Sequence, residues 1–118
     1  MPLVHAYYVP EKIGEETFTK LHEVLSVAVS AVLSGSEANS SLEPDDIEIA
    51  GFCLQHGEDN FHGVDLAIVI WAHDFPSRRE NVDYRAQGIL DQLRESLPLG
   101  HIRVFVWIIL APTGFAKI

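Results

Sequence analysis

The residue with the clearest chemical potential is Pro2, which follows Met1 and precedes an apolar stretch, Leu3 to Val9. Removal of Met1 would leave a secondary amine that this stretch anchors. An α-amino group titrates near ~7.7–8.0, and burial or a nearby arginine favours its neutral form. A neutral amine can take a proton from carbon next to a carbonyl group, and such general base catalysis supplies on the order of 10²–10⁴-fold. While Met1 remains, the Pro2 nitrogen is an amide without a basic lone pair.

Two neighbouring arginines, Arg78 and Arg79, could hold a substrate carboxylate. A guanidinium binds a carboxylate through two parallel hydrogen bonds and stabilises charge that develops on an enolate. Both precede a predicted helix, where cations are unfavourably placed near the positive end of the helix dipole. This placement favours a function, but solvated residues of a first helical turn explain the pair equally well. Candidate pocket walls, or else core or interface residues, are Tyr7, Phe75 and Trp107.

No metal or cofactor is predicted. The histidines do not pair at metal-ligand spacing with a supporting acid, and the sequence has neither an HExxH motif nor a Gly-rich phosphate loop. Cys53 lies in an apolar stretch and is interpreted as an inert core thiol. The six histidines are His5, His22, His56, His62, His73 and His101.

Composition excludes several functional classes. The formal net charge is −9, from eight basic and seventeen acidic residues, which argues against a basic surface for nucleic acid. The longest apolar run, Val104 to Ala111, is too short to cross a bilayer, and no basic region precedes an apolar run at the amino terminus. With one cysteine and 47% apolar residues, the chain is expected to be a cytoplasmic protein without a membrane partner.

The hydrophobic pattern predicts six elements. Short β-branched and aromatic runs indicate strands, and apolar residues three or four positions apart indicate helices. Ser77-Arg78-Arg79-Glu80 fits a capping box that opens the second helix. In order, the elements are a strand at Leu3–Val9, a helix at Glu15–Leu33, a strand at Ile47–Leu54, a strand at Val64–Ala72, a helix through Val82–Leu97 and a strand at Ile102–Leu110.

This order is a duplicated β-α-β unit of the α/β (α+β) class. We expect one domain over residues 1–118, with pseudo-repeats at about 2–54 and 64–110. Two such units side by side make a four-stranded mixed sheet with both helices on one face. The strands are apolar on both sides, so the uncovered face should pack against other subunits in a closed homo-oligomer.

The layout, the size and the start Met1-Pro2-Leu3-Val4 resemble the tautomerase superfamily, and its longer trimeric branches most of all. The approach to the second strand, Leu42 to Ile47, and the arginines that open the second helix add to this resemblance. It implies a catalytic Pro2, a carboxylate-binding Arg78 or Arg79, and a trimer. Asp46 resembles an aspartate that relatives use to handle water, and Lys12 follows the first strand, where another member has a substrate-binding arginine. The chain departs from the cytokine-like branch, which has a lysine at the end of the first helix.

Three functional hypotheses follow. The first is an isomerase, a keto–enol tautomerase that moves a proton on a small 2-oxo or enol carboxylic acid with Pro2 as general base. The second is a decarboxylase or hydratase with Pro2 as general acid and Asp46 as the group that handles water. The third is a non-catalytic oligomeric binding protein that keeps the fold.

Overall fold

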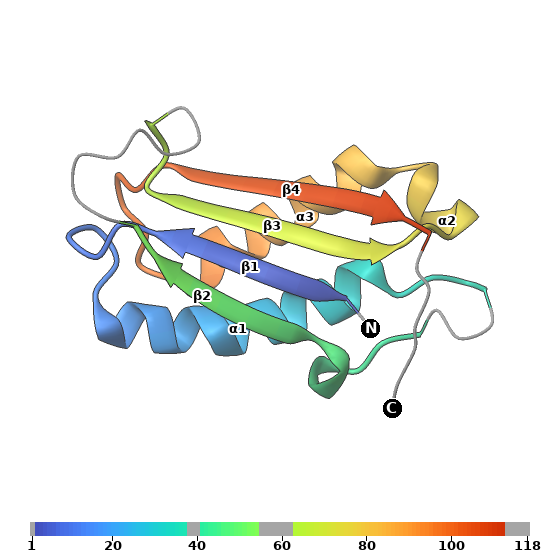
Figure 1. Ribbon diagram of the computed structural model, residues 1–118, viewed down its shortest axis with the longest axis horizontal. Coiled ribbons are helices and arrows are strands. Elements are labelled where there is room, and N and C mark those ends of the chain that lie inside the picture. The colour runs from blue at the N-terminus through green and yellow to red at the C-terminus, as the bar shows by residue number, and fades with distance from the viewer. Residues whose placement is uncertain (1, 38–40, 55–62, 113–118) are drawn as a thin grey trace.

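The computed structural model describes residues 2–37, 41–54 and 63–112 (Figure 1). The two long helices and the four strands lie close to where the sequence predicts them, with boundaries shifted by up to two residues. The elements are β1 (Leu3–Tyr8), α1 (Glu15–Leu33), the 3-10 turn η1 (Pro44–Asp46), β2 (Glu48–Cys53), β3 (Leu66–His73), α2 (Pro76–Arg79), α3 (Val82–Ser96) and β4 (Val104–Ala111).

The strands form one mixed sheet in the order β2-β1-β3-β4. Within each β-α-β unit the two strands are parallel, while β1 and β3 join the units in antiparallel register. The predicted duplicated fold is therefore confirmed. Leu3 pairs with Glu48 and with Trp71, and His73 pairs with Ala111. One end of the sheet thus carries the starts of β1 and β2 and the ends of β3 and β4; we call it the Pro2 end.

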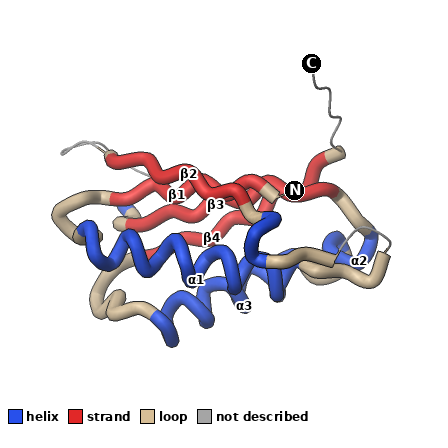
Figure 2. Tube along the Cα trace, turned by 90° about the horizontal axis from the view of Figure 1, so that it is seen from below, coloured by secondary structure: helices blue, strands red, loops and turns tan. Residues whose placement is uncertain are grey.

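Helices α1 and α3 lie side by side under one face of the sheet (Figure 2). Helix α1 buries Leu21, Leu25 and Val29, at the spacing that keeps side chains on one side of a helix. Helix α3 buries Ile89 and Leu93 in the same way. Within the described part of the chain, no helix is long and apolar enough to span a membrane.

The opposite side of the sheet, which we call the open face, is apolar but not covered by helices (Figure 2). Alternate strand residues point to it. On this face, the centre of the His5 ring lies 4.7 Å from the centre of the Trp71 ring. Four large side chains on it are exposed: Leu3 by 37%, Phe52 by 41%, Phe105 by 40% and Trp107 by 50%.

Two local predictions are wrong. Ser77 and Glu80 make no capping box, because α2 is a separate short helix whose N-cap is Phe75. The Ser77 side chain instead donates to Glu37, a residue of the segment that follows α1. Cys53 is exposed and not in the core, because β2 is an edge strand at one side of the sheet.

The close approach of α1 to β2 requires a glycine at position 51. A Cβ atom built on Gly51 would lie 2.3 Å from Cζ of Phe18, so Gly51→Ala must displace this ring. We expect the substitution to lower the free energy of unfolding by roughly 1–3 kcal/mol, measured by urea denaturation.

Gly88→Ala is the matched control in α3. Its Cβ would meet Val32 at 3.6 Å, an ordinary contact, and alanine favours a helix over glycine by up to about 1 kcal/mol. This variant should be more stable than the wild type. Equal effects of the two substitutions would contradict the described packing of Phe18.

Candidate functional site

Pro2 lies at the start of an inner strand. Its side chain is fully buried, and its carbonyl oxygen accepts a hydrogen bond from the Glu48 amide at 3.1 Å, which fixes it to β2. Continuing the β1–β3 register by one residue places Pro2 opposite Ala72. The anchoring that the sequence predicts for this position is present, while Met1 lies outside the described residues.

Several predicted site residues share the Pro2 end. Phe75, Arg78 and Arg79 follow β3 directly, and Asp46 comes just before β2. Figure 1 shows α2 at the same end of the sheet as the start of β1.

Other predicted site residues lie elsewhere in the chain. Tyr7 is near the far end of β1, five residues from Pro2, or about 17 Å at the strand rise of 3.3 Å per residue. Lys12 is in the turn beyond that end. Trp107 is midway along β4, where it pairs with Val69. Within one chain, Tyr7 and Lys12 therefore lie far from Pro2.

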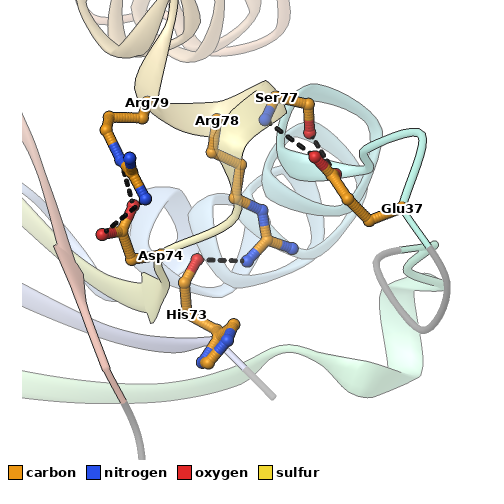
Figure 3. A network of polar contacts seen from close by, with 6 residues as sticks. All are labelled: Glu37, His73, Asp74, Ser77, Arg78 and Arg79. Atoms are coloured by element: carbon orange, nitrogen blue, oxygen red, sulfur yellow. Dashed lines mark hydrogen bonds and ion pairs between the residues drawn. The ribbon is translucent and has the colours of Figure 1, made fainter.

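Arg78 is a buried structural side chain, only 2% exposed. Its Nε donates to the Leu33 carbonyl at 2.8 Å, and its Nη1 donates to the His73 carbonyl at 2.9 Å (Figure 3). The guanidinium also lies 4.9 Å from the centre of the Phe75 ring, a cation–π contact. Burial lowers the pKa of Arg78 from its ordinary value, the neighbouring charge of Arg85 lowers it further, and Glu37 opposes both.

Arg85 is a structural residue that the sequence interpretation missed. Its side chain donates to the carbonyls of Val32 and Ser34 at the end of α1, and also to the Ser77 carbonyl. The last carbonyls of a helix have no partner within it, and α1 has no basic residue in its last turn. The absence of a basic residue in the last turn of α1 is the one sequence signal that other parts of the chain must cap this helix.

Arg79 is the accessible arginine at this end. Its side chain is 64% exposed and pairs with Asp74, with Nε at 3.0 Å from Oδ1 and Nη2 at 3.2 Å from Oδ2. Within residues 2–37, 41–54 and 63–112, its Nη1 group has no partner. The Nη1–Nη2 edge of the fork can therefore receive a carboxylate while Nε stays bound to Asp74.

Glu37 is a second residue that the sequence interpretation missed. Its carboxylate accepts hydrogen bonds from both the hydroxyl and the amide of Ser77, the latter at 2.8 Å (Figure 3). These bonds from Ser77 lower the pKa of Glu37. The contact joins the segment after α1 to the start of α2, and no local motif signals it because 40 residues separate the partners.

Asp46 has a local structural contact. Its Oδ2 accepts the Glu43 amide at 2.8 Å, which closes the turn before β2. The carboxylate is half-buried and stands at the Pro2 end. Across the described ranges, no group of histidine, cysteine or acidic side chains is placed to hold a metal ion; His56 and His62 lie outside those ranges.

Comparison with solved structures identifies the fold. The chain is similar to a fused 4-OT described as a wild-type symmetric trimer, with a TM-score of 0.66, 13% identity, and coverage of 98% of this chain and 92% of that one. It is similar to a malonate semialdehyde decarboxylase inhibited by 3-bromopropiolate (TM-score 0.59, 17% identity, coverage 98% and 91%). A macrophage migration inhibitory factor-like protein from Entamoeba histolytica matches at TM-score 0.58 and 10% identity, with coverage of 94% and 87%.

These similarities span nearly the whole chain, so the predicted resemblance to the tautomerase superfamily is confirmed at the level of the fold. No protein-family model and no curated protein sequence matches this chain.

The two arginines provide a test of the described contacts. Arg78→Met removes a buried charged donor from the carbonyls of Leu33 and His73, and we expect it to lower the free energy of unfolding by about 2–4 kcal/mol. Arg79→Met removes an exposed ion pair, so its cost should stay below about 1 kcal/mol. Urea denaturation of both variants measures the difference. A loss for Arg79→Met as large as that for Arg78→Met would show that the roles are assigned wrongly.

Proposed function

We propose that this protein is an isomerase that moves a proton on a small 2-oxo or enol carboxylic acid, with Pro2 as general base. The observation that carries this proposal is the arrangement of the Pro2 end, where Pro2 begins an inner strand and an exposed arginine, Arg79, stands at the same end. The shared fold with 4-OT structures supports it.

The chemistry follows from these residues. The free Pro2 nitrogen takes a proton from the carbon next to the substrate carbonyl, and the protonated amine returns it at the other position. The Nη1–Nη2 edge of Arg79 holds the substrate carboxylate. Arg78 does not bind substrate in this scheme, because Leu33 and His73 already hold its Nε and Nη1.

We further propose that the chain forms a homotrimer through its open face. Leu3, Phe52, Phe105 and Trp107 leave apolar surface on that side, and the fused 4-OT structures are themselves described as trimers. Since Tyr7 and Lys12 lie far from Pro2 within a protomer, they can contribute only to the site of a neighbouring copy. The composition favours a cytoplasmic location.

A decarboxylase or hydratase is the second candidate. The observation in its favour is Asp46, whose carboxylate lies at the Pro2 end, together with the similarity to a malonate semialdehyde decarboxylase. In this case Pro2 remains protonated as a general acid and Asp46 positions water. This candidate would be favoured if the wild type catalyses loss of carbon dioxide or addition of water but no ketonisation, and if Asp46→Asn abolishes that activity.

The role of Pro2 is tested with ketonisation of phenylpyruvate or 2-hydroxymuconate, followed by ultraviolet absorbance. Intact mass should first show that Met1 has been removed. Pro2→Ala should then lower kcat/KM by on the order of 10²–10⁴-fold, and Arg79→Ala should raise KM because the carboxylate anchor is lost.

Arg94→Ala is the matched control. Arg94 is an exposed arginine near the end of α3, where it lines a hollow together with Leu97 and Ile102. It should leave the rate unchanged. Retention of Met1 in the native protein would exclude catalysis by Pro2 and favour the non-catalytic binding protein.

The assembly is tested by sedimentation equilibrium. The wild type should sediment as a trimer, and Trp107→Glu should shift it towards monomer, because a charge would be buried in the apolar contact. Tyr84→Glu is the control, since Tyr84 is 78% exposed on the helical side. A monomeric wild type, or a trimer that tolerates Trp107→Glu, would contradict assembly through the open face.

A further inference from the structure

His73 is the last residue of β3 and lies at the Pro2 end. The β1–β3 register pairs Leu3 with Trp71. Its continuation places Ala72 opposite Pro2, and directly opposed residues of antiparallel strands have Cβ atoms about 4.5–5.5 Å apart. His73 follows Ala72, so the end of β3 brings His73 to the amino end of β1.

The face that His73 occupies agrees with this placement. Strand side chains alternate between faces, so His73 shares the open face with Trp71 and does not point into the helical core. Its ring is partly buried and meets the Phe75 ring edge-on, with 4.6 Å between the ring centres. Figure 3 shows the imidazole next to the amino end of β1.

The backbone of His73 is held on two sides. Its carbonyl accepts from Nη1 of Arg78 at 2.9 Å and from the Phe75 amide at 3.1 Å. The next residue, Asp74, donates its amide to Ala111 and binds Arg79 through its side chain. The buried Arg78 and the ends of β3 and β4 thus hold the His73 backbone and the Asp74–Arg79 pair at the Pro2 end of the sheet.

We propose that His73 is the second acid–base group of this site, acting at the substrate oxygen while Pro2 acts at carbon. In enolisation, the C–H bond next to the carbonyl breaks and its proton passes to the Pro2 nitrogen. The electron pair forms the C=C bond, and the carbonyl oxygen receives the proton of a protonated His73. In ketonisation His73 accepts the enol O–H proton, protonated Pro2 delivers a proton to carbon, and water restores both groups. This inference rests on the proposed isomerase function.

The test uses the full-length protein with Met1 removed and phenylpyruvate enol as substrate. His73→Gln keeps the side-chain length and a hydrogen-bond donor but cannot exchange a proton, so kcat should fall at least ~10²-fold with KM nearly unchanged. In His73→Ala, added imidazole should restore a substantial part of kcat. If His73 had a purely structural role, His73→Gln would not lower kcat selectively, and imidazole would not restore the activity of His73→Ala.

His101→Ala is the control, because His101 is an exposed loop residue just before β4, at the opposite end of the sheet. It should retain the wild-type rate and gain nothing from imidazole. If Pro2→Ala abolishes turnover while His73→Gln keeps kcat, the role of His73 is refuted and the isomerase function stands. If the wild type has no turnover, the isomerase function fails, and this inference fails with it.

Discussion

The closure of the carboxyl end of α1 by two arginines is the interaction on which the arrangement of this molecule depends. A helix end leaves carbonyl groups without partners, and α1 provides no cation of its own in its last turn. Arg78 and Arg85, both from the second β-α-β unit, donate to Val32, Leu33 and Ser34. The second β-α-β unit therefore supplies the hydrogen-bond donors that the end of the first unit's helix lacks.

This closure also positions the candidate site. Arg78 reaches the end of α1 and the end of β3 at once, which holds α2 at the Pro2 end of the sheet. Glu37 reinforces the same junction through Ser77. Because burying a charged group is costly unless its donors are paired, the position of Arg78 is tightly constrained. Its neighbour Arg79 is not buried and lies at the surface.

The chemistry proposed for the protein depends on a single atom, the Pro2 nitrogen, and on the sheet that holds this residue. The sheet buries the Pro2 ring and fixes its carbonyl to β2, so only the bond to Met1 separates the fold from a basic amine. The open face adds a second condition. It leaves large apolar side chains uncovered. Tyr7 and Lys12 lie at the far end of β1, so the proposed pocket could include them only from a neighbouring copy of the proposed trimer.

The sequence by itself determined the elements, their pairing into two units and the place of Pro2 at a strand end. These follow from local signals: short β-branched and aromatic runs in strands and a period of 3.6 in helices. It also placed Arg78, Arg79 and Asp46 near strand ends. Only the tertiary structure separated the buried Arg78 from the exposed Arg79, revealed Glu37 and Arg85, and brought His73 to the amino end of β1. The physical reason is that these placements depend on cross-strand register and on hydrogen bonds between residues 40 to 53 positions apart, which no local pattern encodes.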